Sequence, residues 1–291
     1  MKNVYYFILL IIGFSAFHSC KELADEDGNL LNNMGQNPGG LTGSRALFRE
    51  MTDSDTLEYH YDGLKLSDVS TDSTLTKIVY NSDMINKITF DGFVNLHDSI
   101  SYTRFFTYDA AGKISTISET SKKYYIGLPA QPMKKYKALY TLKYKTNGQL
   151  DSIITKKGEE ITAMPFEFTT YSKKAYTFTG MNLTGMVDKM GGMSGSIYGP
   201  VTAQTNFEFS DYDDKINPYS RLLPFGFNIH QLLDDNKTSF KSYRLSANNP
   251  KKVSITSNLI ITPVVSTTAY GYDAQNYVLT GFGLTYMYKP F

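Results

Sequence analysis

Residues 105–114 read FFTYDAAGKI, and this stretch decides the fold. Phe106 and Tyr108 alternate with a polar residue, which is the period of a β-strand that has one apolar face. Asp109 can start a turn by bonding its own backbone, and Gly112 can take the positive φ that ends a four-residue loop. An aliphatic strand follows, so the stretch predicts a β-hairpin.

The same unit of strand, tyrosine, turn and strand recurs along the chain. It appears in residues 75–88, 140–153 and 269–278, and a shorter version begins at Tyr59. The intervals are unequal, so this is a degenerate repeat and not a strict solenoid. Tandem hairpins build a meander. The sequence therefore predicts an all-β fold over residues 46–291, an antiparallel sheet that is curled or barrel-like.

The composition agrees with this fold. The chain of 291 residues has 23 Tyr and 18 Phe but no Trp. Aromatic and β-branched residues suit a pleated, half-buried surface. The formal net charge is +1 and no basic patch stands out, so a nucleic-acid partner is not expected.

Two segments interrupt the hairpin pattern. Residues 180–204 are rich in Gly and Met and have little periodicity, which predicts a mobile loop. Residues 217–235 are the best helix candidate, and Pro224 should divide them into two short helices.

The first twenty residues have the form of an export signal. A cationic start at Lys2 precedes an uncharged apolar run over residues 4–14, which is too short for a membrane-spanning helix. Ser19 then precedes Cys20, the only cysteine. This end resembles a bacterial lipobox, although residues 17 and 18 depart from the usual pattern. The resemblance implies cleavage of a signal peptide (1–19) and acylation of Cys20. The alternative is a buried cysteine after an ordinary helix.

Residues 20–45 predict a flexible tether behind the lipid anchor, because Gly, Asn and Pro dominate without periodicity. A Lys followed by acids directly after Cys20 resembles the surface-export signal of Bacteroidota lipoproteins; the other reading is a solvated acidic tether. The expected location is the outer membrane, lipid-anchored, with the cell surface favoured over the periplasmic side.

The second half carries a recognisable string of motifs at residues 212–219, 245–252 and 270–273. Their order resembles a family of Bacteroidota lipoproteins of unknown function with a porin-like fold. The resemblance covers most of residues 57–291, and the hairpins also resemble the YD-type repeat without its strict spacing. It implies an antiparallel sheet on a lipid anchor, and it carries over no catalytic residue.

The sequence motifs predict no catalytic, cofactor-binding or metal-binding residue. His60, His97 and His230 have no metal-ligand spacing. Residues 192–196 imitate G-x-S-x-G but lack its last glycine and its strand-to-helix context. Acids cluster at Asp211, Asp213 and Asp214, and again at Asp234 and Asp235. Turn chemistry explains Asp213 and Asp214 best, although a carboxylate pair for glycoside hydrolysis stays open because the fold sets its geometry.

Lysines and tyrosines gather in residues 122–140 and offer a sugar-stacking platform or, as the blander alternative, a filled sheet face with a charged edge. The leading hypothesis is a non-enzymatic envelope protein held by its lipid anchor. Its partner would be a glycan, a lipid or a membrane protein. The alternatives are an envelope or glycan-active hydrolase, a purely structural protein, and an integral outer-membrane β-barrel. The last fits a terminal Phe291, but Pro290 and lysines on both strand faces oppose it.

Overall fold

The computed structural model describes residues 44–93, 98–125, 133–233 and 239–290. The predicted signal peptide, Cys20 and nearly all of the predicted tether lie outside these ranges. So do His97, Asp234, Asp235 and Phe291.

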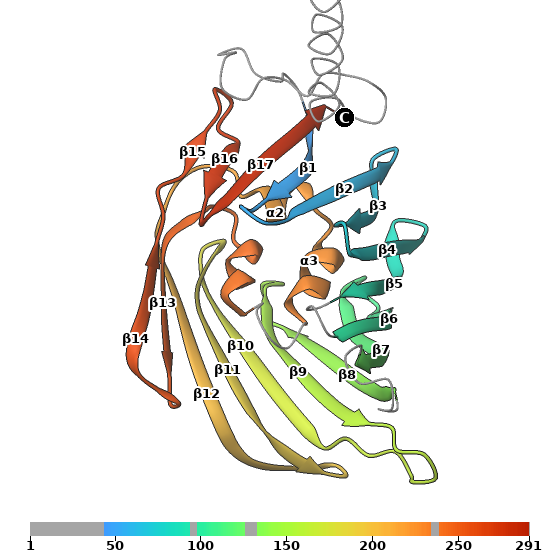
Figure 1. Cartoon of the computed structure of the whole chain (residues 1–291). Coiled ribbons are helices and arrows are strands. Elements are labelled where there is room, and N and C mark those ends of the chain that lie inside the picture. Colours follow the sequence, from blue (N-terminus) through green and yellow to red (C-terminus); the bar gives the residue numbers. More distant parts are fainter. Residues whose placement is uncertain (1–43, 94–97, 126–132, 234–238, 291) are drawn as a thin grey trace, which may run out of the picture.

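Seventeen strands of one sheet make up most of the described chain (Figure 1). They are β1 (Arg45–Met51), β2 (Thr56–Asp62), β3 (Lys65–Ser70), β4 (Thr74–Asn81), β5 (Met84–Phe93), β6 (Asp98–Tyr108), β7 (Ile114–Tyr125), β8 (Lys134–Tyr144), β9 (Leu150–Glu159), β10 (Thr170–Thr179), β11 (Asn182–Ser194), β12 (Ile197–Tyr212), β13 (Pro250–Ser257), β14 (Ile260–Thr267), β15 (Gly271–Tyr272), β16 (Val278–Gly281) and β17 (Leu284–Pro290).

The strands form an antiparallel meander that curls back on itself. Consecutive strands pair from β1 through β14 and again from β15 through β17, and β17 returns to pair with β1 (Arg45↔Pro290). Among the described strands the register does not continue from β14 to β15, so the sheet is not closed there. The predicted all-β meander is confirmed, and its form is a curled sheet with one open seam.

The curled sheet has two ends, which we name by the course of the chain. At the entry end, β1 begins and β17 finishes, side by side near the top of Figure 1. The turns at residues 63–64, 109–113 and 145–149 belong to this end. The far end carries the opposite connections, including residues 52–55, 71–73 and 160–169.

The turns follow the sequence prediction. Asp109 Oδ1 accepts hydrogen bonds from the backbone N–H groups of Ala111 and Lys113, both at 2.9 Å. Gly112 and Gly148 have φ of 74° and 87°, the left-handed region that glycine enters without strain.

Three short helices lie on the concave side of the sheet (Figure 1). They are α2 (Pro218–Leu222), α3 (Phe225–Leu232) and the 3-10 helix η2 (Ser239–Leu245). Asn217 caps α2 by accepting the Tyr219 N–H at 3.0 Å, and Pro224 separates α2 from α3. The predicted pair of helices divided at Pro224 is confirmed. In the described ranges, no helix is both long and apolar enough to cross a membrane.

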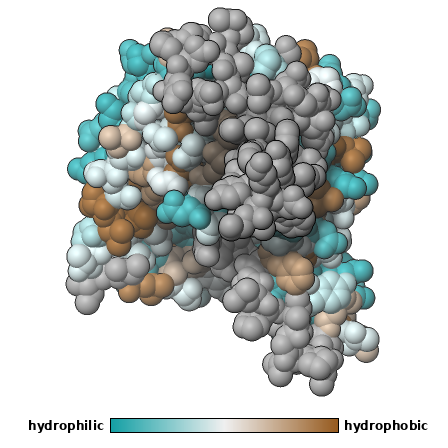
Figure 2. Space-filling model, turned by 45° about the horizontal axis from the view of Figure 1, so that its top comes forward, coloured by the Kyte–Doolittle hydropathy of each residue, from teal (hydrophilic) through white to brown (hydrophobic). Residues whose placement is uncertain are grey.

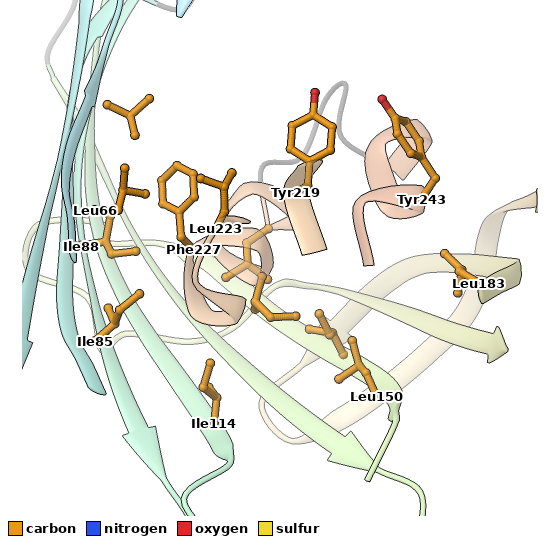
Figure 3. Packing of buried hydrophobic residues seen from close by; sticks show 14 of the residues in the cluster. Leu66, Ile85, Ile88, Ile114, Leu150, Leu183, Tyr219, Leu223, Phe227 and Tyr243 are labelled. Atoms are coloured by element: carbon orange, nitrogen blue, oxygen red, sulfur yellow. The ribbon is translucent and has the colours of Figure 1, made fainter. Parts of the chain in front are cut away.

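The core fills the space between the helices and the sheet. Strand residues such as Ile88, Ile114 and Leu150 point toward Phe227 and Leu223 of the helical segment (Figure 3). Polar residues alternate with these buried ones along the strands and face the other side. Exposed examples are Lys77, Lys122, Lys143, Lys173, Lys189 and Glu208. The sheet is therefore apolar inside, and its outer face mixes charged residues with exposed apolar ones such as Val79 and Phe105.

The prediction of a mobile loop at residues 180–204 is wrong. This segment forms most of the long hairpin of β11 and β12, with Leu183 and Met186 in the core. Its glycines serve the sheet. A Cβ on Gly191 would lie 2.5 Å from the Pro200 carbonyl oxygen and 2.8 Å from the Tyr171 ring, so only glycine allows this approach. Residues 192–196 form the end of β11 and its turn, not a nucleophile elbow.

The tyrosines at the strand ends have a shared role. Each of several even-numbered strands ends in a tyrosine whose hydroxyl donates to a backbone carbonyl at the start of the preceding strand. The bonds are Tyr61 to Leu47 (2.9 Å), Tyr80 to Leu66 (2.9 Å), Tyr108 to Ile85 (2.7 Å) and Tyr144 to Ile114 (3.0 Å), and Tyr212 bonds Leu183 in the same way. Partial burial raises the pKa of Tyr80 and of Tyr144 to about 12. These hydroxyls remain neutral donors that join one hairpin to the next.

Candidate functional site

The first cluster of ionisable groups lies buried between η2, α2 and the sheet. Glu50 accepts hydrogen bonds from Arg244 Nη2 at 2.7 Å, from Tyr219 at 2.8 Å and from Tyr59 at 3.1 Å. The Arg244 guanidinium also stacks 3.8 Å from the centre of the Tyr219 ring. Burial alone would raise the pKa of Glu50, but Arg244, Lys241 and the two tyrosine hydroxyls hold it below its usual value. Glu50 is therefore a carboxylate within the core.

A second buried cluster ties α3 to β6 and β7. Arg104 Nε donates to Glu119 at 2.8 Å, and Arg104 Nη1 donates to the backbone oxygen of His230 at 2.8 Å and to His230 Nδ1 at 3.0 Å. Tyr140 donates to Glu119 at 2.8 Å. Burial, aided by the Arg104 charge, lowers the pKa of His230 well below 6.5, so this imidazole is neutral.

These two clusters fasten the helices to the sheet. Their arginines and carboxylates are at most 6 % exposed, and each charge faces an opposite one. Each of these charges is therefore satisfied within the core. Over the residues that the structure describes, no three His, Cys, Asp or Glu side chains come together as a metal site would require.

The other residues singled out in the sequence have structural partners. Asp213 Oδ1 accepts the backbone N–H of Lys215 at 3.0 Å, which is the predicted turn chemistry, and that of Asn249 at 3.1 Å. Tyr272 donates to the second carboxylate oxygen. His60 is half-buried on β2 and lies 3.8 Å from Glu58. Asp213, Asn249 and Tyr272 come from the three motifs of the recognisable string, and the fold brings these motifs together.

A groove on the outer face of the sheet is the candidate site. It has a volume of about 720 Å³ and crosses β4 to β8. Thr89 on β5, Thr103 on β6 and Thr120 on β7 lie side by side in register and form its hydroxyl-bearing floor. Ser101 of the next row also lines it. The neighbours of these residues along each strand, such as Ile88 and Tyr102, are buried, which places the groove on the face opposite the core.

Lysines border this floor. Lys77 lies opposite Thr89 in register, and Lys122 of β7 lies directly opposite Lys135 of β8. Like charges opposite each other destabilise an antiparallel pair. Within the described ranges none of these three lysines has an ion pair, whereas Lys137 nearby is paired with Glu160 at 3.3 Å. Asp91 completes the border, so the groove offers cationic donors, hydroxyls and a carboxylate; Tyr136 lies in the same row as buried Tyr102 and Ser121 and therefore faces the core.

The sequence indicated the part of this groove that lies on β7 and β8. The lysines and tyrosines of residues 122–140 drew attention to β7 and β8, and Lys122 and Lys135 do line the groove. Tyr140 does not, because its side chain is buried against Glu119. The floor on β5 and β6 was missed, because threonines and serines on alternating strand positions are ordinary in any β-sheet.

Comparisons with known proteins address the fold. A porin-like protein from Bacteroides vulgatus ATCC 8482, known from its crystal structure, aligns with 85% of this chain and 100% of its own length at a TM-score of 0.51 and 15% identity. This chain has a porin-like fold. A porin-like protein from Bacteroides uniformis ATCC 8492 aligns with 83% of this chain and 93% of its own at 11% identity, but its TM-score of 0.30 is too low to establish a common fold. No family model matches the chain, and no curated protein does.

Proposed function

We propose that this chain is a lipid-anchored protein of the cell envelope that binds an acidic glycan in the outer groove, without a catalytic step. The groove carries this proposal. Hydroxyls and the Asp91 carboxylate suit a polyhydroxylated ligand, and three lysines without an ion pair in the described ranges suit carboxylate or phosphate groups on it.

The placement of the groove supports a tethered receptor. Cys20 precedes Arg45 in the sequence, and Arg45 begins β1 at the entry end. Lys77, Lys122 and Lys135 lie in the far-end halves of their strands. A lipid anchor on Cys20 would thus connect to the domain at its entry end, away from the groove, and the predicted flexible tether would leave the groove open to a ligand. Several acyl chains on Cys20 would anchor the protein stably, because each buried CH₂ contributes about 0.8 kcal/mol.

The charges on the outer face favour an anchor over an integral outer-membrane barrel. Strands that cross a bilayer alternate apolar residues outward with polar residues inward. Here Leu66, Ile88 and Ile117 face the core, and the outer face of the described strands has no continuous apolar band, because lysines such as Lys122 and Lys143 stand among its exposed apolar residues. Lysine at the bilayer midplane costs about 2–4 kcal/mol.

The decisive test is glycan binding by the full chain. We expect binding to polygalacturonate, an acidic polysaccharide, but not to neutral dextran, as measured by isothermal titration calorimetry. The variant Lys122→Ser/Lys135→Ser should weaken binding about tenfold, a loss of about 1.4 kcal/mol, because charge-assisted bonds disappear.

The matched control is Lys143→Ser/Lys173→Ser, which removes two exposed lysines that do not line the groove. Equal losses in both variants would show that general positive charge attracts the polymer, and the groove would not be the site. Release of new reducing ends during the incubation would favour the hydrolase alternative.

The anchor has its own test. Cys20→Ala should move the protein from the membrane fraction to the soluble fraction. Mass spectrometry of the membrane form should find acyl groups on Cys20. Protease treatment of intact cells would separate surface display from a periplasmic location.

A further inference from the structure

A small cavity at the entry end is lined by two buried side chains, each of which carries a polar atom that lacks a partner in the described residues. It has a volume of about 210 Å³ and is lined by Asn228 of α3 and Arg244 of η2, among others. These residues are 2 % and 1 % exposed. Within the described residues, Asn228 Oδ1 and Arg244 Nε have no hydrogen-bond partner. Buried polar atoms are nearly always bonded, so the pair marks a place where a bound group completes the bonding.

The other hydrogen bonds of Asn228 and Arg244 determine which donor and which acceptor remain for a ligand. Asn228 Nδ2 donates to the Tyr219 carbonyl at 2.8 Å, which leaves the amide oxygen as the acceptor. The terminal nitrogens of Arg244 are engaged by Glu50 and Gln231, which leaves the Nε–H as a donor. A hydroxyl or a primary amide can accept from one and donate to the other. A carboxylate only accepts, and an ammonium only donates.

A path lined by apolar residues and by polar ones such as Asn147 and Gln149 leads out of this cavity. A neighbouring cavity of about 320 Å³ shares Met181, Phe225 and Leu245 with it, and a third of about 410 Å³ shares Phe225 with both. Met84, Met181 and Phe225 are 45 %, 67 % and 47 % exposed along this path. Figure 2, which brings the top of Figure 1 forward, shows apolar patches beside hydrophilic ones. A path of this kind fits an alkyl chain.

We propose that the entry end binds a neutral single-chain amphiphile. Its hydroxyl or amide head lies between Asn228 and Arg244, and its alkyl chain covers Phe225. The buried donor and acceptor at the inner end, and the apolar residues that continue from them, fit one occupant of this kind. The site depends neither on the outer groove nor on Cys20, so its failure would leave the proposed function standing.

The chain has no Trp, so Phe225→Trp in the full chain provides a single fluorescent reporter in the path. The probes are decan-1-ol, decanamide, decanoate and decylammonium, each below the concentration at which it aggregates. We expect saturable shifts of the emission, with the alcohol and the amide about tenfold tighter than decylammonium. Phe93→Trp, an exposed site at the far end, should not respond.

Asn228→Leu in the Phe225→Trp background should abolish the preference for the alcohol and the amide. If that variant does not fold, the affinities of the four probes for the Phe225→Trp variant alone still test the proposal. Equal affinity for all four would refute the head-group site. No response at residue 225, or an equal response at residue 93, would show that the cavity takes only water.

Discussion

Replacing Glu50 by leucine should cost much of the free energy of unfolding. The change leaves the Arg244 guanidinium, 1 % exposed, without its counter-charge. Breaking a buried ion pair in this way costs about 3–5 kcal/mol. Tyr59 and Tyr219 also lose an acceptor, at about 1 kcal/mol each. Because folded proteins are stable by about 5–15 kcal/mol, Glu50→Leu should bring the domain close to unfolding.

The double variant Glu50→Leu/Arg244→Met tests the reasoning. Replacing both partners by apolar residues removes the uncompensated charge, and such replacements are often close to neutral. We expect the double variant to be more stable than either single variant, in urea unfolding followed by circular dichroism and tyrosine fluorescence together. Additive losses would mean that Glu50 and Arg244 are not coupled, and the account of the core would be refuted.

The same cluster predicts a pH dependence. Burial opposes ionisation of Glu50, yet Arg244 and the neighbouring donors keep its pKa below 4.5. A lowered folded pKa gives stability that is complete above the unfolded pKa, about 4.5 for this group, and is lost as the pH falls through the folded pKa. The double variant should lack this acid-sensitive component.

Three further substitutions concern single side chains. Tyr108→Phe should lose about 0.5–1.5 kcal/mol of unfolding free energy, because its hydroxyl bonds the Ile85 carbonyl. Phe178→Tyr should gain a similar amount of unfolding free energy in the same urea assay. Phe178 lies at the end of β10, where a tyrosine hydroxyl would face the start of β9 at Leu150. A loss of stability at both positions would contradict the role of these tyrosine hydroxyls in joining the hairpins. His230 has a lowered pKa, so its contribution to wild-type stability should be complete above about pH 6.5. Below that pH the free energy of unfolding should fall by up to about 1.4 kcal/mol per pH unit, because the unfolded state binds the proton more readily. His230→Gln should flatten this slope. Parallel pH profiles of the two proteins would show that another group titrates.

The sequence was sufficient for the hairpins because their causes are local. Asp109 and Gly112 form their turn through bonds within five residues. Pro224 separates α2 from α3 because it lacks the N–H that a continuous helix needs. Such features depend on neighbours in the chain, so a single sequence reveals them.

The hairpin at residues 180–204 escaped prediction for a different reason. Gly185 and Gly191 depress strand propensity, and Met is not β-branched. The tertiary structure overrides these preferences. Met186 packs into the core on one side of β11, and the missing side chain of Gly191 makes room for the Tyr171 ring on the other.

The buried pairs could not be predicted either, because their partners are far apart in the sequence. Glu50 and Arg244 are 194 positions apart, and Arg104 and His230 are 126 apart. Nothing local distinguishes Glu50 from the exposed acids of neighbouring strands. Only the curl of the sheet around the helices brings these partners together.

The three motifs of the recognisable string meet beside the open seam. Between β14 and β15 the described strands lack a continuing backbone register. Side chains of residues 270–273 instead reach β13, the residues after β12, and β1. Tyr270 donates to the Pro250 carbonyl at 3.0 Å, Tyr272 reaches Asp213, and Asp273 pairs with Arg45 of β1. Each of these bonds needs one particular side chain. Residues of the three motifs therefore hold the β15 segment against β13 and the residues after β12, and Asp273 ties it to β1, where the sheet lacks a continuous backbone register.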